Sequence, residues 1–417
     1  MLNDHNRVPA MIFFRGIGLC VLVVTFFAQT VVPFNVGAWT PAANTFSSQS
    51  CSQAANLRMR PYVRAHPQRR KPLWLATSNL EAKDAGAGRT EDVELREGSF
   101  VVDGFRCYYC VATPPDESVD AGIDPVVFVH GAASNSAHFQ RNLKPLAAEL
   151  RSPVYAIDLL GYGKSSKPPG VLYGQELWAW EISTFLDEVV TSTPAFLVGH
   201  GLGAYACMEA AATNPEGVAG LAVMAPSARY GVLNPSGLDA FWLRWGFVAQ
   251  QLGEQLLRKF SGPAAVRETL RSRYADPTKV DESVVAALAE PWVDPRAAAA
   301  GKFVFASLYT ADAGPTWEDL ISEEEVGYCG PLLAVWGDKD EENLVDDLQV
   351  LRGLQPKMQQ TVVDAGHYPF HEKAEEVNQA LASWVRTHSG KGTDFPIPYR
   401  ARYQRLPLDW NTLKRLL

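Results

Sequence analysis

Short apolar runs alternate with longer segments of helical pattern from residue 93 onward. The apolar runs read PVVFVHG, VYAIDLL, AFLVGH, GLAVMAP and PLLAVWG, and helical stretches such as LGAYACMEAAA separate them. Parallel strands read as continuous apolar runs because helices cover both faces of their sheet, and each crossover between them needs a long connection. The alternation therefore predicts an α/β fold with a mostly parallel sheet flanked by helices.

Three more strands complete a predicted sheet of eight. VELREGSFVV and FRCYYCVA lie on either side of an Asp-Gly pair, which favours a tight turn, and TVVDAGH precedes a closing helical stretch, EKAEEVNQALASWV. A further helix is expected near residues 342–353. We assign the core of the domain to residues 92–226 and 331–388.

The segment between the two halves of the core, residues 227–330, is rich in Ala, Leu and aromatic residues. Helical segments such as VAQQLGEQLLRKF predict a helical cap over the carboxyl edge of the sheet, where open α/β sheets bind their ligands. Residues 389–417 form a tail beyond the expected domain. The sequence does not decide whether this tail docks on the body or on a partner.

The first 85 residues have the pattern of a targeting leader. Arg7 and Arg15 precede an apolar run, residues 16–57 contain no charged side chain, and small or compact residues end the region at 38, as in a signal peptide over residues 1–38. Residues 39–85 are rich in Ser, Asn, Ala and Arg, which is typical of a disordered transit peptide. This two-part order predicts delivery to a plastid. Simple secretion and an uncleaved membrane anchor are the alternatives.

The charge distribution argues against a nucleic-acid ligand. The total charge is −8, but residues 1–80 carry eight Lys and Arg and one Asp, so the rest of the chain carries −15 and repels phosphate backbones.

Cys107 and Cys110 lie in a strand-like run, where residues i and i+3 point to opposite faces, and we expect structural thiols. With no zinc-finger, P-loop or EF-hand spacing, the sequence predicts neither a metal nor an organic cofactor.

Three segments that end at the carboxyl edge of the predicted sheet carry the candidate chemistry. HGAAS, residues 130–134, follows one strand, and VGHGLGA, residues 198–204, joins another strand to an Ala-rich helix. Such a strand–helix turn is where α/β-hydrolases place their nucleophile in a G-x-S-x-G elbow. Asp340 and His367 follow the last two strands. The order of nucleophile position, acid and histidine is the order of that family.

In this arrangement Asp340 would orient His367 and stabilise its cation, and His367 would act as the general base. Asp338 is the alternative acid. The backbone N–H groups of Ala132 and Leu202 would form an oxyanion hole for the negative oxygen of a tetrahedral intermediate. We expect the turn that bears position 201 to face His367 beneath the cap.

The chain resembles the α/β-hydrolase superfamily from about residue 92 to 388, and within it the plastid and cyanobacterial branch that contains pheophytinases and chlorophyll dephytylases. The resemblance rests on HGAASNSAHFQRNLKPLA, AIDLLGYGKSSKP and, in the cap, LRSRYADPTKVDESVVAALAEPWVDP. It implies an α/β-hydrolase fold with an inserted helical cap, and cleavage of a chlorophyll-type phytyl ester or a similar lipid ester by a Ser-His-Asp triad. The implied partner is a small apolar ester or pigment-like ligand. Membrane contact would be limited to the leader or to peripheral thylakoid association.

Gly201 departs from that pattern, because it stands where the family has its nucleophilic serine. Glycine easily adopts the positive φ of an elbow, but it cannot form an acyl-enzyme. The other possible nucleophiles are poorly placed. Cys207 lies one to two turns into the next helix, Ser134 and Ser136 lie in the oxyanion loop, and His200 is expected to point away from the site.

Three functions are therefore open. The first is a plastid ester hydrolase with altered chemistry, in which His367 activates a water. The second is a catalytically inactive protein that binds an apolar ligand or a partner. The third is a non-hydrolytic enzyme, such as a lyase or isomerase, that uses His367 with Ala132 and Leu202. The presence of both Asp340 and His367 favours retained chemistry. The oligomeric state is left open.

Three other polar residues have structural interpretations. We expect Asp158 to be a structural acid in its Gly-rich loop and His138 to pack against the oxyanion loop. His371 is expected to be exposed on the last turn before the closing helix.

Overall fold

The computed structural model describes residues 90–168, 171, 173–191, 194–226, 262–293, 297, 315–321 and 327–391. Every described residue belongs to one compact unit of the chain. The predicted leader, with its signal-like and transit-like parts, lies outside the described residues. The same holds for residues 227–261, 294–296, 298–314 and 322–326 of the predicted cap and for residues 392–417 of the predicted tail.

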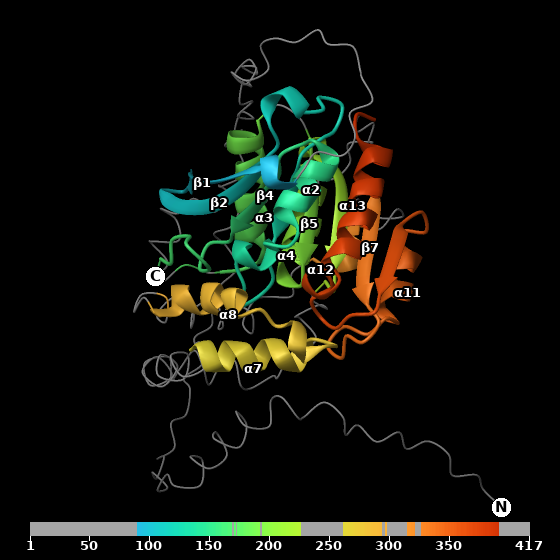
Figure 1. Cartoon of the computed structure of the whole chain (residues 1–417). Coiled ribbons are helices and arrows are strands. Elements are labelled where there is room, and N and C mark those ends of the chain that lie inside the picture. Colours follow the sequence, from blue (N-terminus) through green and yellow to red (C-terminus); the bar gives the residue numbers. More distant parts are fainter. Residues whose placement is uncertain are drawn as a thin grey trace, which may run out of the picture. The chain divides into compact units, whose positions relative to one another are not determined.

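Eight strands form one sheet in the order β1-β2-β4-β3-β5-β6-β7-β8 (Figure 1). Strand β2 pairs antiparallel with β1 and β4, and the other neighbours pair in parallel. This confirms the predicted mostly parallel, eight-stranded α/β-hydrolase sheet. The strands are β1 (Glu94–Val102), β2 (Phe105–Thr113), β3 (Val126–Val129), β4 (Val154–Asp158), β5 (Ala195–His200), β6 (Val218–Met224), β7 (Leu332–Gly337) and β8 (Gln359–Val363).

Helices cover both faces of this sheet. The helices are α2 (Leu143–Leu150), α3 (Gln175–Phe185), α4 (Leu202–Thr213), α7 (Pro263–Arg273), α8 (Glu282–Ala289), α10 (Trp317–Ile321), α11 (Asp347–Leu354), α12 (Pro369–Glu372) and α13 (Ala374–His388). The shorter turns are η2 (Thr90–Asp92), η3 (Asp116–Ser118), η4 (Ser136–Phe139), η5 (Leu186–Val190), η6 (Pro215–Gly217), η8 (Pro277–Lys279) and η9 (Glu290–Val293).

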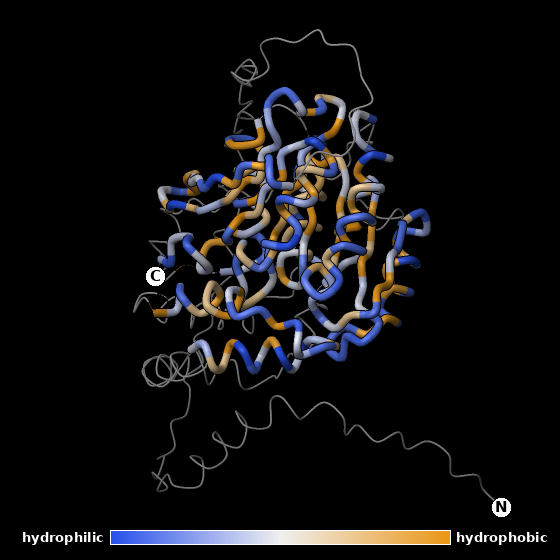
Figure 2. Tube along the Cα trace, in the orientation of Figure 1, coloured by the Kyte–Doolittle hydropathy of each residue, from blue (hydrophilic) through white to orange (hydrophobic). Residues whose placement is uncertain are grey.

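Each face of the sheet has its own hydrophobic core. Val127 and Val129 of β3 belong to the core that includes residues of α3, α4, α10 and α11, whereas Val126 and Phe128 belong to the core that includes residues of α2, α7, α8 and α13. This alternation along β3 is the two-residue period of a strand that is buried on both sides. Figure 2 shows hydrophobic residues along the central strands, as expected for strands between two layers of helices.

The hairpin of β1 and β2 follows the prediction. Asp103 and Gly104 both have positive φ, 49° and 83°, which is the conformation of a type I′ turn. Cys107 and Cys110 are buried and belong to the cores on opposite faces of the sheet. Their separation across the sheet supports structural thiols.

The helix expected near residues 342–353 begins later, at Asp347 of α11. The side chain of Asp340 explains this difference. Its Oδ1 accepts hydrogen bonds from the N–H groups of Glu342 (2.8 Å) and Asn343 (3.1 Å). Short acidic side chains that bond nearby backbone N–H groups compete with helix formation and favour turns.

Helices α7 and α8 belong to the region predicted as a cap. Figure 1 shows both helices beyond the carboxyl ends of the parallel strands. The end of α7 contacts the loop that follows β8, because the N–H of His367 donates to the carbonyl oxygen of Arg273 at 2.8 Å. A Cβ atom at Gly366 would lie 2.3 Å from the same oxygen, so this contact needs glycine. The boundaries of the cap and of the two core segments stay predictions.

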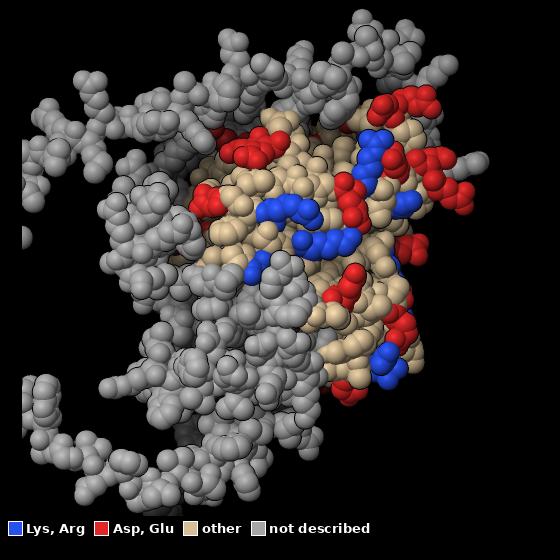
Figure 3. Space-filling model, turned by 90° about the vertical axis from the view of Figure 1, so that its left-hand side faces the viewer, with Lys and Arg blue, Asp and Glu red and all other residues tan. Residues whose placement is uncertain are grey.

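Charged side chains of both signs share the surface. On the face shown in Figure 3, lysine and arginine side chains lie next to aspartate and glutamate side chains. Ion pairs on the protein surface include Lys164–Glu97 (2.7 Å) and Arg151–Asp120 (3.0 Å). In the part of the chain that the structure describes, no helix has the length and apolar character that a membrane span requires.

Candidate functional site

The loops after β3, β5, β7 and β8 meet at the carboxyl edge of the sheet. The contacts among them are short. A Cβ atom at Gly131, after β3, would lie 2.8 Å from Nδ1 of His200, which ends β5. A Cβ atom at Gly337, which ends β7, would lie 2.1 Å from the carbonyl oxygen of Gly366, after β8. The four loops therefore form one site, as the chain order predicts for this fold.

Gly201 occupies the sharp turn between β5 and α4. Its φ is 53° and its ψ is −117°, a conformation that glycine adopts at little cost. Its N–H donates to the carbonyl oxygen of Met224 at the end of β6, at 3.0 Å. The backbone therefore has the sharp, positive-φ geometry expected of a nucleophile elbow, although position 201 has no side chain.

The glycines on both sides of this turn let β5, α4 and β3 approach closely. A Cβ atom at Gly199 would lie 2.4 Å from the Cα of Ala204. A Cβ atom at Gly203 would lie 2.4 Å from the carbonyl oxygens of Val129 and His130. These backbone contacts explain the two outer glycines of the VGHGLGA motif.

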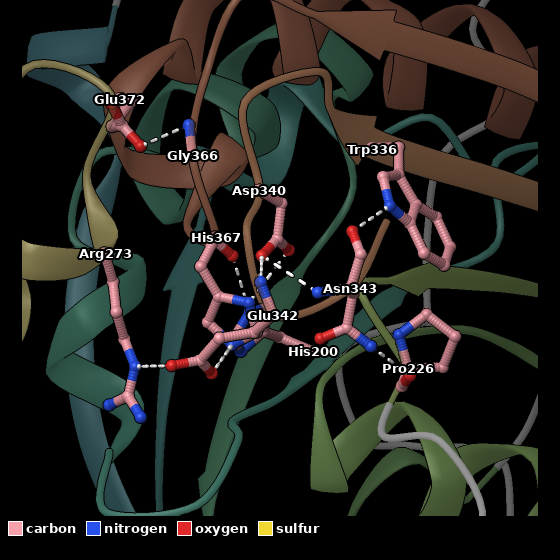
Figure 4. A network of polar contacts seen from close by, with 10 residues as sticks. All are labelled: His200, Pro226, Arg273, Trp336, Asp340, Glu342, Asn343, Gly366, His367 and Glu372. Carbon is pink, nitrogen blue, oxygen red and sulfur yellow. Dashed lines mark hydrogen bonds and ion pairs between the residues drawn. The ribbon is translucent and has the colours of Figure 1, made fainter. Parts of the chain in front are cut away.

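His367 and Asp340 form a hydrogen-bonded pair. Nδ1 of His367 donates to Oδ2 of Asp340 at 2.9 Å (Figure 4). The Asp340 side chain is fully buried, whereas the His367 side chain keeps 12% of its surface exposed. Asp338, the alternative acid, is exposed, and its N–H bonds to Val363. The structure thus brings Asp340 to the imidazole.

The environment of Asp340 favours its carboxylate form. Burial acts to raise the pKa of Asp340, but the hydrogen bond and charge of His367 and the N–H groups of Asn343 and Glu342 outweigh it and lower the pKa. Asn343 is fixed in turn, because its Nδ2 donates to Pro226 at 2.8 Å and its carbonyl oxygen accepts from Trp336 at 2.8 Å. The acid loop is therefore held by its own strand and by the end of β6.

His200 connects the elbow to the histidine loop. Its Nε2 donates to the carbonyl oxygen of His367 at 2.9 Å, and the two rings meet edge to face with their centroids 4.8 Å apart. The expectation that His200 points away from the site is therefore wrong. Burial, with the nearby His367 next in importance, lowers the pKa of His200 to about 3, so this ring is neutral. His200 positions the loop and the elbow relative to each other.

The predicted oxyanion donors lie in the segments that these contacts join. Ala132 follows Gly131, whose Cα is packed against His200, and Leu202 opens helix α4 directly after Gly201. The first N–H groups of a helix have no intrahelical partner. The backbone N–H of Leu202 is therefore available to an anionic oxygen at the helix start.

Glu342 is a residue of the site that the sequence did not reveal. Its Oε2 lies 3.8 Å from Nε2 of His367, and its Oε1 accepts a hydrogen bond from Nε of Arg273 at 2.5 Å. Figure 4 shows Glu342 between Arg273, at the end of α7, and His367. Within the acidic run DKDEE, the sequence offers no signal that separates Glu342 from its solvated neighbours.

A second polar chain runs behind the site. Oγ of Ser134 lies 3.0 Å from Nδ1 of His138, whose Nε2 lies 3.3 Å from the hydroxyl of Tyr274, and that hydroxyl lies 3.1 Å from Nδ1 of His371. His138 therefore packs against the oxyanion loop, as expected. Asp158 also has the structural role predicted for it, because it accepts the N–H of Ser136 at 2.7 Å.

His371 is fully buried, so its predicted exposure is wrong. Pro369 starts the short helix α12, and the following turn directs the ring of His371 toward His138 and Tyr274. Burial lowers the pKa of His371 to about 4, with a contribution from Arg141. Its Nε2 has no hydrogen-bond partner among the described residues.

The other possible nucleophiles are enclosed. Cys207 is fully buried in α4, and burial raises the pKa of its thiol. Ser134 and Ser136 are buried as well, with 8% and 5% of their surfaces exposed. Across the ranges that the structure describes, no group of three or more His, Cys, Asp or Glu side chains is arranged to hold a metal ion.

Comparisons with known proteins agree with the fold. Residues 126–380 match the model of the alpha/beta hydrolase family. The chain is 24% identical over 311 residues to the chloroplastic pheophytinase of Arabidopsis thaliana, covering 63% of this chain and 61% of that protein. It is 30% identical over 274 residues to the dihydrolipoyllysine-residue acetyltransferase component of the acetoin cleaving system of Pseudomonas putida, covering 64% of this chain and 65% of that protein.

The chain thus spans less than two-thirds of the length of both relatives. Among solved structures, a thermophilic esterase from Thermogutta terrifontis has the same fold, with a TM-score of 0.51 and 20% identity, covering 70% of this chain and all of that one. The family match covers more than half of the chain, and the sheet order agrees with it. The chain belongs to the alpha/beta hydrolase family.

Proposed function

We propose that the protein is a carboxylic-ester hydrolase that acts on a lipid or chlorophyll-type phytyl ester, with a water as its nucleophile in place of a serine. The observation that carries this proposal is the hydrogen bond between Nδ1 of His367 and the buried Asp340. That bond leaves Nε2 as the proton acceptor, and the ring keeps an exposed edge.

The reaction needs no covalent intermediate. Nε2 of His367 takes a proton from a water as the water oxygen bonds to the carbonyl carbon of the ester. Asp340 stabilises the imidazolium that forms. The N–H groups of Ala132 and Leu202 hold the oxyanion, and His367 then returns the proton to the leaving alcohol as the ester C–O bond breaks. The products are an acid and an alcohol.

Several features support an apolar ester in a plastid. The chain resembles pheophytinases and chlorophyll dephytylases in its cap as well as in its core, and one relative bears the name chloroplastic pheophytinase. The two-part leader is the address expected of a plastid protein. Association with thylakoids would then be peripheral or limited to the leader.

His367→Ala tests this proposal. We expect ester turnover, measured with p-nitrophenyl acetate and with pheophytin, to fall at least ~100-fold, because general-base catalysis is lost. His388→Ala is the matched control, since His388 lies at the end of α13. Equal turnover by the wild type and His367→Ala would exclude water activation by this histidine.

A binding protein without turnover is the second candidate, and the glycine at position 201 favours it. An elbow without a hydroxyl can still bind the carbonyl group of an ester. This function predicts saturable binding of pheophytin by the wild type and no release of phytol. Slow phytol release that depends on His367 would rule it out.

A further inference from the structure

The carboxylate of Glu342 lies on the side of His367 where a serine hydrolase needs its nucleophile. Asp340 occupies Nδ1 at 2.9 Å, and Oε2 of Glu342 lies 3.8 Å from Nε2. A serine hydroxyl would normally lie at that second nitrogen. Here Nε2 faces a carboxylate instead, and position 201, where the sequence motif would place that hydroxyl, is glycine.

A separation of 3.8 Å is long for a direct hydrogen bond but suits a shared water. One water oxygen can lie about 2.8 Å from both Nε2 and Oε2, which is the usual length of such bonds. The Glu342 side chain keeps 46% of its surface exposed, so water has access to it. Both of the acceptors that such a water needs are thus already in place.

We propose that Glu342 is a further catalytic residue that holds and orients the attacking water. This inference rests on the proposed ester hydrolysis. The water donates one hydrogen to Nε2 of His367 and the other to Oε2 of Glu342, and a lone pair of its oxygen points at the ester carbon. The first hydrogen transfers to His367 as the new C–O bond forms. The second stays on the product acid, and the proton on His367 goes to the leaving alcohol.

Arg273 positions this carboxylate. Its Nε bonds to Oε1 of Glu342, which turns Oε2 toward the imidazole. The carbonyl oxygen of Arg273 also accepts the N–H of His367. Arg273 is the last residue of α7, so one residue of the cap holds both the histidine and the carboxylate.

The test compares Glu342→Gln and Glu342→Ala with the wild type, using p-nitrophenyl acetate. A hydrogen bond to a charged acceptor that is made in the transition state predicts a loss in kcat of about 10-fold for Gln and about 100-fold for Ala, with KM nearly unchanged. Glu341→Gln removes the same charge from the neighbouring exposed residue and is the matched control. We expect it to behave as the wild type. Arg273→Ala should lower kcat as well, whereas Arg271→Ala, on the same helix, should not.

A second arm uses the Gly201→Ser background, in which the serine hydroxyl becomes the proton donor to Nε2. The fast acylation burst should then lose less than about 3-fold on Glu342→Gln, because no water takes part in that step. Equal losses in the burst and in wild-type turnover would indicate a general structural role and overturn the inference. Turnover that requires His367 but is unchanged in Glu342→Ala would overturn the role of Glu342 alone. If the wild type shows no turnover that depends on His367, both the proposed hydrolysis and the role of Glu342 are overturned.

Discussion

Gly201→Ser is expected to raise the rate of ester hydrolysis by roughly 10³-fold or more, because removing the serine from a complete triad costs at least that much. The turn already has the φ of 53° and ψ of −117° of an elbow, and His200 next to it contacts His367. The acid and the base are hydrogen-bonded at 2.9 Å without a nucleophile. A hydroxyl added at position 201 would complete a triad of serine, His367 and Asp340.

The matched control is Gly201→Ala, which adds a Cβ atom without a hydroxyl. Both substitutions place an L-residue at positive φ and should cost on the order of 1–3 kcal/mol of stability. Only the serine variant should gain activity. If turnover of p-nitrophenyl acetate by Gly201→Ser stays at the wild-type level in a folded protein, then the oxyanion donors or the cap no longer suit an ester.

The second large effect is a loss of stability in acid, caused by buried histidines. Burial lowers the pKa of His200 to about 3, that of His371 to about 4, and that of His138 well below its usual range. In the unfolded chain a histidine has a pKa of about 6.5. Below that pH the unfolded chain therefore binds protons at these residues, whereas the folded protein does not. The free energy of unfolding therefore falls as the pH falls from about 6.5 toward 4. At pH 5, His200 and His371 each account for roughly 2 kcal/mol of the loss.

Glu181 acts in the opposite direction. Burial raises its pKa to about 8, so its contribution to stability grows as the pH falls from 8 toward 4.5. Between pH 7 and pH 5, protonation of Glu181 raises the free energy of unfolding by roughly 2–3 kcal/mol. His200 and His371 together outweigh it, with a net loss of roughly 1 kcal/mol between pH 7 and pH 5, and the buried His138 acts in the same direction as these two histidines.

Urea unfolding at pH 7 and pH 5 measures this loss. His371→Gln removes one of the buried titrating groups and should reduce the pH dependence by up to about 1.4 kcal/mol per pH unit. Equal stability at the two pH values would contradict the neutral, buried state of the histidines.

The sequence predicted the sheet well because burial on both faces leaves a direct mark on strand composition. A continuous apolar run such as VVFV, at β3, is typical of a central strand that helices cover on both faces of the sheet. The Asp-Gly pair fixed the hairpin through its positive φ values. The start of α11 was misplaced because the carboxylate of Asp340 bonds N–H groups of residues that would otherwise begin a helix.

The site residues could be predicted where residue type and position after a strand both match the pattern of the fold. They could not be predicted where contacts between distant segments determine the position of a side chain. Asp340 and His367 follow the last two parallel strands, and parallel strands bring their carboxyl ends together. Glu342 depends on Arg273, which lies far away in the sequence. The burial of His371 depends on aromatic rings from two other segments. Neither contact has a local signature.

The most direct test of the central claim, that water rather than a side chain attacks the ester, is mass spectrometry of the intact protein, quenched during turnover of p-nitrophenyl acetate. The wild type should turn over without an acyl adduct that forms and decays at the turnover rate, whereas Gly201→Ser should accumulate one on residue 201. A kinetically competent acyl adduct on the wild type, on Ser134 or any other side chain, would contradict the account.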